Sequence, residues 1–186
     1  MNVNTAILLK GCLENDIQSQ EQLYRLFYPG MIKVCSRYTN NIDDAGSIYN
    51  NAMMKVFKSL RKYKDEGKLE AWVKTIVVNC CIDFCKQQKM FKQSVPYVDQ
   101  NEAAIRPEAF DRLSGKEVQQ LISQLPQATA TVFNLFVYEG FTHKQIAEQL
   151  GISDNTSKWH VSEAKRLLKT KLLIFTETEL QKNAAG

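Results

Sequence analysis

The sequence has no long apolar run, and none of its hydrophobic stretches approaches the roughly 18 residues that a membrane span needs. It also opens without the basic and then apolar pattern of a secretion signal. We therefore expect no membrane insertion and a cytoplasmic location. Only four Pro and eight Gly occur among 186 residues, which leaves little room for long irregular segments. Apolar residues recur at helical rather than alternating spacing, so the predicted fold class is all-α.

Patterns for metals and catalysis are scarce as well. The five cysteines include no Cys-x-x-Cys pair, and both histidines lie far from them in the second half. Zinc sites need four ligands at short spacings, and Gly-rich phosphate loops and nucleophile–base pairs are also missing. We expect no metal, no cofactor, no small-molecule substrate and no enzymatic activity. Buried free thiols are the favoured interpretation of the cysteines, and a redox or metal switch at Cys80, Cys81 and Cys85 is the alternative.

The segment from Leu125 to Leu172 carries the clearest pattern. Thr142 is a plausible N-cap for a short helix, which ends at Gly151 and is followed by a longer helix. Two helices joined by a tight turn with Gly at its start and an apolar residue, here Ile152, in its middle form the helix-turn-helix pattern. Gly151 suits the left-handed position that closes the first helix, and the Ser153 hydroxyl suits the cap of the second.

The second helix has two distinct sides when it is rolled out at about 100° per residue. The side predicted to face the core carries Ser157, Val161, Ala164 and Leu168. The opposite side carries Asn155, Trp159, Ser162 and Arg166, flanked by Lys158 and Glu163. An exposed Trp is costly unless something covers it, and the major groove of DNA covers such a side chain in a recognition helix. The alternative is two packed helices that merely meet at a Gly turn.

The N-terminal half is also predicted to be helical. Pro29-Gly30 is expected to end the second helix, and Asp43-Asp44 to open a long one. A charged loop from Arg61 to Lys68 precedes the last helix. The predicted helices span residues 5–14, 19–28, 31–38, 44–60 and 69–89.

Positive charge is concentrated in this half. Ten basic residues face only four acidic ones between Lys55 and Lys92, although the formal net charge of the whole chain is only +4. Such a stretch favours a polyanionic partner, while a solvated lysine-rich face is the plainer explanation.

One side of the last N-terminal helix aligns Trp72, Asn79 and Lys86, with Thr75 and Asp83 alongside. Rings that stack on bases and cations that bind phosphates suit single-stranded nucleic acid. Packing of Trp72 in the core is an equally good interpretation. Asp83 is expected to pair with a nearby Lys and to be structural.

Composition shifts between the two halves, where Pro96 and Pro107 interrupt the apolar periodicity. We therefore predict a helical domain at residues 1–91, a flexible linker at 92–112, a helix-turn-helix domain at 113–175 and a polar tail at 176–186. A helix capped by Ser114 is expected to lead into the Pro126 break.

The chain resembles the bacterial extracytoplasmic-function sigma factors over roughly residues 8–90 and 114–173. The first half resembles their four-helix σ2 domain through Asp43 to Ala45, Lys68 to Ile76, Asn79 and Asp83. The second half resembles their σ4 domain through Leu125 to Phe141, Ile146 to Glu148, Leu150 to Ser153, Ala164 and Lys165.

This resemblance implies a transcription initiation factor that binds core RNA polymerase and promoter DNA, with an anti-sigma factor as a further partner. The residues that it places at the −35 element are Thr142, Lys144, Thr156, Lys158, Trp159, His160, Ser162, Glu163 and Arg166. Those that it places at the −10 element, which the N-terminal domain would read and open, are Arg61, Lys62, Tyr63, Lys64, Lys68, Trp72, Thr75, Asn79 and Lys86. Those that would dock on core polymerase are Asp43, Asp44, Ser47, Asn50, Asn51 and Met54.

The chain departs from the family pattern in two places. Positions that commonly carry acidic residues hold Gly46, Ser47, Asn50 and Asn51, so docking would depend more on hydrogen bonds than on charge. In the recognition helix, Ser157 stands at a usually apolar position. Glu163 stands at a frequently basic reading position, where a carboxylate can accept a hydrogen bond from cytosine N4.

The competing hypothesis is a stand-alone helix-turn-helix regulator. Such a protein would normally dimerise on a palindromic site and would bind it without polymerase. It would leave the basic loop and Trp72 without a function.

Overall fold

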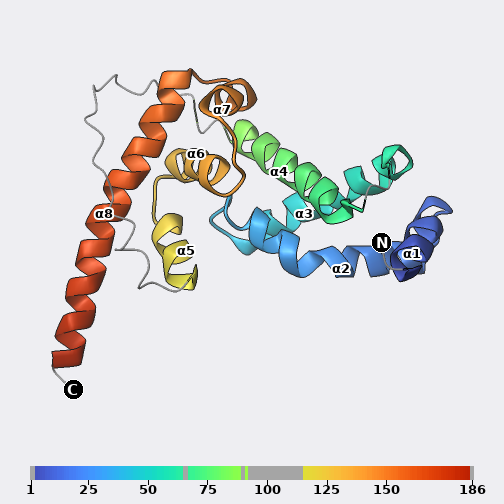
Figure 1. The fold of residues 1–186 in the computed structure, drawn as a ribbon, viewed down its shortest axis with the longest axis horizontal. Coiled ribbons are helices and arrows are strands. Elements are labelled where there is room, and N and C mark those ends of the chain that lie inside the picture. The colour runs from blue at the N-terminus through green and yellow to red at the C-terminus, as the bar shows by residue number, and fades with distance from the viewer. Residues whose placement is uncertain (1–2, 65–66, 89–90, 92–114, 185–186) are drawn as a thin grey trace. The chain divides into compact units, whose positions relative to one another are not determined.

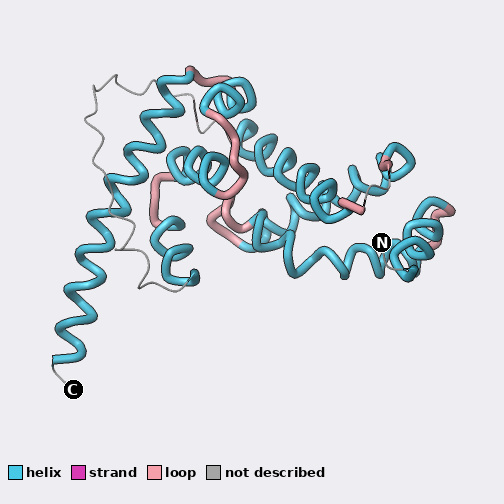
Figure 2. Tube along the Cα trace, viewed as in Figure 1, coloured by secondary structure: helices cyan, strands magenta, loops and turns pink. Residues whose placement is uncertain are grey.

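The computed structural model describes residues 3–64, 67–88, 91 and 115–184. These residues form helices and loops without a strand (Figure 2), which confirms the all-α prediction. The chain divides into two compact units, Met1–Gln88 and Lys89–Gly186, coloured from blue to green and from yellow to red in Figure 1. The predicted linker, 92–112, lies outside the described residues. Within them, no helix is both long and apolar enough to cross a bilayer.

In the first unit, the described residues form four α-helices and one 3₁₀ turn. Asn41 caps α3 by accepting a hydrogen bond from the Asp44 backbone N–H at 2.7 Å, and the acidic first turn suits the helix dipole. Both α2 and α3 pack on α4, which buries Val78, Cys81 and Ile82 as well as Leu69, Val73 and Val77. The elements are α1 (Val3–Leu13), α2 (Ile17–Cys35), α3 (Ile42–Ser59), η1 (Leu60–Lys62) and α4 (Leu69–Gln87).

The predicted helix end at Pro29-Gly30 is wrong, because α2 continues through both residues to Cys35. Pro29 and Gly30 are exposed, whereas Phe27 and Met31 on either side are buried. Proline removes one backbone hydrogen bond, and burying a continuous apolar stripe on both sides of it offsets that loss. The two short helices expected on either side of Pro29 are therefore one long helix.

The second unit has its core where α8 crosses α5 and α6. Leu121 and Leu125 pack with Ala164, Leu168 and Leu172 in one buried cluster. Helix α8 continues to Ala184 through most of the segment predicted as a polar tail. Ser114, the predicted cap of α5, lies outside the described residues. The helices are α5 (Gly115–Ser123), α6 (Gln127–Val137), α7 (His143–Leu150) and α8 (Asp154–Ala184).

The five cysteines are free and buried in the first unit, as predicted. A hydrogen bond with Cys35, together with burial, raises the pKa of the Cys81 thiol well above its usual range. Burial also raises the pKa of Cys80. These thiols stay protonated near neutral pH, which makes them poor nucleophiles and poor metal ligands. In the part of the chain that the structure describes, no cluster of His, Cys, Asp and Glu is placed to hold a metal ion.

Candidate nucleic-acid interface

The turn between α7 and α8 has the local geometry that the sequence predicts. The Thr142 hydroxyl accepts a hydrogen bond from the Gln145 backbone N–H, and the Gln145 side chain accepts one from the Thr142 N–H at 2.8 Å. Gly151 ends α7 at φ 69° and ψ 36°, in the left-handed region that favours glycine. The Ser153 hydroxyl accepts a hydrogen bond from the Thr156 N–H at 3.0 Å at the start of α8. Both caps and the Gly turn are therefore confirmed.

The inner side of α8 is also confirmed. Ser157, Val161, Ala164 and Leu168 are all at most 4% exposed, so these positions face the core of the second unit. This burial fixes the rotation of α8 about its own axis. The remaining side of the helix is consequently the one available to a partner.

The outer side of α8 is polar, with one large ring. Asn155, Lys158 and Arg166 are exposed, and Trp159 is half-buried, as are Ser162 and Glu163. The Trp159 ring meets the His160 ring edge-on, with centroids 4.9 Å apart. Trp159 is thus supported from beneath while part of its surface remains accessible.

His160 does not belong to this outer side, although the resemblance placed it at the −35 element. Its side chain is only 5% exposed, and its Nδ1 lies 3.1 Å from the Thr129 hydroxyl of α6. Burial lowers the pKa of His160 to about 4, so the ring is neutral near pH 7. A neutral, enclosed and hydrogen-bonded ring supports the orientation of α8 and does not present a base-reading group.

Sequence reasoning missed a second histidine contact. The His143 ring stacks on Phe136 with centroids 4.6 Å apart, and its Nδ1 lies 3.0 Å from the hydroxyl of the fully buried Ser157. This contact joins α6, α7 and α8. The departure at Ser157 was the available signal, since a hydroxyl at a core position needs a hydrogen-bonding partner.

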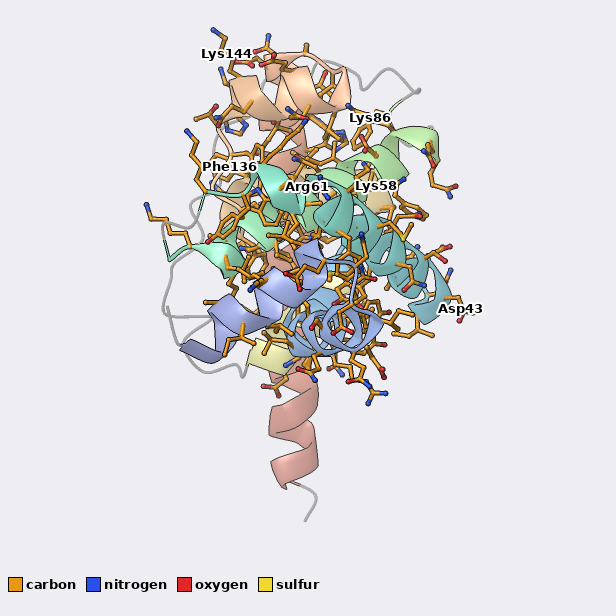
Figure 3. The ribbon with its side chains drawn as sticks, turned by 90° about the vertical axis from the view of Figure 1, so that its right-hand side faces the viewer. Asp43, Lys58, Arg61, Lys86, Phe136 and Lys144 are labelled. Atoms are coloured by element: carbon orange, nitrogen blue, oxygen red, sulfur yellow. The ribbon has the colours of Figure 1, made fainter. Side chains whose placement is uncertain are left out.

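The residues predicted near phosphate lie at the starts of α7 and α8. Lys144 projects from the first turn of α7 into solvent (Figure 3). Thr142 is exposed, but its hydroxyl is engaged in the cap, and the Thr156 hydroxyl lies 2.8 Å from that of Ser153. Backbone N–H groups and a cation at a helix start form a favourable setting for phosphate.

In the first unit, the predicted aromatic and polar residues form a ridge on α4. We use α4 ridge for Lys68, Trp72, Thr75, Asn79 and Lys86, which successive helical turns place on one side. All of these are exposed except the half-buried Trp72. The Tyr63 and Trp72 rings lie 5.0 Å apart at 41°, so the ridge begins with a pair of aromatic rings.

The loop before the ridge is basic and largely exposed. Arg61, Lys62 and Lys64 are exposed at the end of η1 and just after it. A cavity of about 400 Å³ opens where this loop approaches α1 and α2. Its lining residues are Thr5, Leu26, Phe27, Gly30, Met31, Gly67, Leu69 and Glu70. Gly67 at the end of this loop thus lines the cavity together with Leu69 and Glu70 at the start of α4.

Asp83 lies on the same side of α4 as the ridge, one turn after Asn79, and pairs with Lys55 of α3. Its carboxylate lies 3.0 Å from Lys55 Nζ, which confirms the predicted pairing with a nearby Lys. Both side chains are about half exposed, so the pair contributes little to stability.

The residues expected to dock on polymerase lie along one side of α3. Asp43 points into solvent at the first turn (Figure 3), and Met54 is 56% exposed on the same side. Two of the polar residues also serve the fold. Asp44 accepts a hydrogen bond from the Asn41 amide, and Asn50 accepts one from the Tyr24 hydroxyl at 2.7 Å. Ser47 and Asn51 are exposed on the same side of α3.

The fold and these surfaces define a protein with a helix-turn-helix in its second unit and a basic, aromatic surface on its helical first unit. The family model described as Sigma-70 region 2 matches residues 23–90, and that described as Sigma-70, region 4 matches residues 115–168.

Two curated proteins of Bacillus subtilis (strain 168) are similar over most of the chain. RNA polymerase sigma factor SigV is 23% identical over 172 residues, 90% of this chain and 93% of its own length. RNA polymerase sigma factor SigZ is 25% identical over 152 residues, 82% of this chain and 86% of its own length. The chain belongs to the extracytoplasmic-function sigma factors of the sigma-70 family. It is a promoter-directing transcription initiation factor and not a stand-alone regulator.

Proposed function

We propose that the two units divide promoter recognition between them. The second unit reads the −35 element with the outer side of α8, and the first unit reads and opens the −10 element with the α4 ridge and the loop before it. The observation that carries this division is the difference between the two surfaces. A capped helix-turn-helix suits duplex DNA, whereas the ring pair of Tyr63 and Trp72 beside cations suits unpaired bases.

The −35 surface consists of the exposed outer side of α8 and the starts of α7 and α8. Lys158, Trp159 and Ser162 stand where base edges would lie, and Lys144 stands where a phosphate would lie. His160 is left out because it is buried. Duplex binding of this kind needs both phosphate contacts and base-edge contacts, and these residues provide both.

Core polymerase would bind the exposed side of α3 that carries Asp43, Ser47, Asn51 and Met54. An exposed Met within a polar stripe provides an apolar anchor that adapts its shape. Asn50 and Asp44 hold hydrogen bonds within the unit and orient this side. An anti-sigma factor would act by covering one of these surfaces, and the protein would work in the cytoplasm, where polymerase meets promoters. Catalysis of RNA synthesis would remain with the polymerase.

Transcription in vitro tests the proposal directly. The full chain is mixed with core RNA polymerase and fragmented genomic DNA of the source organism, and the 5′ ends of the transcripts are mapped. New start sites that share two upstream elements at a constant spacing are expected. They should require both the chain and core polymerase.

The Val161→Asp variant is the matched control. It places an unpaired charge in the core of the second unit and should remove recognition of the upstream element. Specific binding of the chain to DNA without polymerase, with no new start sites, would contradict the proposal.

A further inference from the structure

Arg166 and Glu163 form a two-point ion pair on the outer side of α8. Arg166 Nε donates to Glu163 Oε2 at 2.8 Å, and Arg166 Nη2 donates to Glu163 Oε1 at 2.7 Å. The Arg166 side chain is 60% exposed and the Glu163 side chain 17% exposed. The arginine is therefore the member of the pair that is accessible to a partner, and the carboxylate lies beneath it.

The geometry points to Arg166 as the side chain that reads a guanine at the −35 element, with Glu163 as the positioning residue that holds its guanidinium in place. This inference rests on the proposed function, because it assigns a base preference to the surface that was proposed to read DNA. It replaces the expectation that Glu163 itself accepts a hydrogen bond from cytosine.

The number of donors on Arg166 supports this assignment. A guanidinium has five N–H donors, and the bonds to Glu163 use one on Nε and one on Nη2. The remaining edge has one N–H on Nη2 and two on Nη1, which include two parallel donors. Two parallel donors match O6 and N7 of guanine in the major groove, the commonest base-specific contact of arginine.

The helix positions of the two residues place the guanidinium level with the first half of α8. Arg166 lies three residues after Glu163, which is about 4.5 Å further along the helix axis. The ion pair draws its head group back toward the level of Glu163 and Ser162, closer to the start of α8. In helix-turn-helix proteins, the first half of the recognition helix contacts the base edges. A basic group thus stands at the reading position although residue 163 is acidic.

Glu163 is poorly suited to read a base itself. Both of its oxygens accept hydrogen bonds from Arg166, and its side chain is mostly covered. The Arg166 hydrogen bond lowers the pKa of Glu163, so the carboxylate remains charged near neutral pH. Next to DNA phosphates this anion is tolerated because its charge is neutralised by the arginine. Removal of Arg166 would leave an uncompensated negative charge facing the DNA.

The test uses holoenzyme assembled from the full chain and core polymerase. The probe is a pool of linear DNA duplexes with one fully randomised segment, and bound duplexes are sequenced. Wild-type holoenzyme should enrich a guanine at one base pair of the upstream element. Arg166→Lys should reduce preference for that guanine by roughly 5- to 150-fold, the range of a good bidentate contact, and leave the other positions unchanged. Lys169→Ala, which removes an exposed cation one turn further along, is the control and should alter no base preference.

The Glu163 variants separate positioning from reading. Glu163→Gln should weaken preference for the same guanine, and in the Arg166→Lys background it should add nothing further, because the two residues act as one unit. Arg166→Ala should also lower the overall affinity for DNA. Glu163→Gln added to Arg166→Ala should restore that affinity without restoring the preference for guanine.

Three outcomes would overturn the inference. One is a loss of preference in Glu163→Gln at a different base pair, one whose preference Arg166→Lys leaves unchanged, which would show that Glu163 reads a base itself. Another is a uniform loss of affinity for all sequences in Arg166→Lys, which would indicate a phosphate contact. The third is a selected upstream element in which no guanine depends on Arg166. If wild-type holoenzyme enriches no sequence at all, the proposed function itself fails, and the inference fails with it.

Discussion

The hydroxyl of Ser157 on α8 lies 3.0 Å from Nδ1 of His143 on α7, so a hydrogen bond joins the two helices of the helix-turn-helix. Ser157 is fully buried, and the His143 ring is stacked on Phe136. Helix packing alone would favour an apolar residue at position 157. The serine instead ties the angle between α7 and α8 to a specific polar contact.

We expect Ser157→Ala to destabilise the second unit by about 1–2 kcal/mol, because His143 loses its partner and a small void remains. Thermal unfolding monitored by circular dichroism measures the change. His143→Phe combined with Ser157→Ala should cost less than the two single changes added together, since the pair then contains no unpaired polar group. Additive costs would show that the hydrogen bond contributes nothing.

Neutral His160 should make the stability of the second unit depend on pH. Its pKa is lowered to about 4 in the folded protein, compared with about 6.5 in an unfolded chain. Between these values the unfolded state binds more protons, so stability should fall as pH falls from about 6.5 toward 4. Burial also lowers the pKa of His143, which acts in the same direction.

Two-dimensional NMR of the imidazole C–H groups measures both titrations, because the chain has only two histidines. His160→Gln identifies the signals and should flatten the pH dependence of the unfolding temperature. A His160 signal that titrates near its ordinary value would show that the ring is open to solvent.

Trp159→Ala should reduce promoter binding by the holoenzyme roughly tenfold while leaving the fold intact, because the ring lies on the outer side of α8. Gel shifts measure binding, and circular dichroism measures helical content. Val161→Asp is the matched control on the opposite side of the same helix and should lose helical content as well as binding. Equal loss of helix in both variants would mean that Trp159 is a core residue.

Asn79→Ala and Lys68→Ala should impair promoter opening more than promoter binding, because the α4 ridge is proposed to hold unstacked bases. Each base stacked on an aromatic ring contributes roughly 1–3 kcal/mol, and these two residues flank the Trp72 ring on the same ridge. Permanganate reactivity near the start site measures opening, and gel shifts of the holoenzyme on duplex promoter measure binding.

Lys33→Ala, which removes an exposed cation from α2, controls for loss of charge. Equal losses of opening and binding in the ridge variants would indicate phosphate anchoring only. No loss in either assay would exclude the ridge from the site.

The Lys55–Asp83 pair is half exposed, in contrast to the buried Ser157, and should contribute little to stability. Asp83→Asn should change stability by less than about 1 kcal/mol, because both side chains are half exposed and solvent screens the pair. Chemical denaturation of the full chain tests this, with the unfolding transition of the first unit as the quantity measured. A loss of several kcal/mol would mean that Asp83 supports α3 and α4 far more than its exposure indicates.

The sequence by itself determined those features that depend on local chemistry. Gly151 and Ser153 predicted the turn correctly, because left-handed backbone and a capping hydroxyl are properties of single residues next to a helix end. The spacing of Ser157, Val161, Ala164 and Leu168 predicted the buried side of α8, since helical periodicity alone decides which residues share a side. The assignment to the family rested on motifs of the same local kind.

Only the tertiary structure decided features that depend on what packs against a residue. Pro29 lies inside α2 because apolar burial on both sides of it outweighs one lost hydrogen bond, and no local signal contains that balance. His160 is not part of the proposed DNA surface, because its buried ring lies within hydrogen-bond distance of Thr129, 31 residues away in the sequence. Glu163 and Arg166 were known to share a side of α8, but which of them is exposed depends on how the rest of the second unit covers the carboxylate.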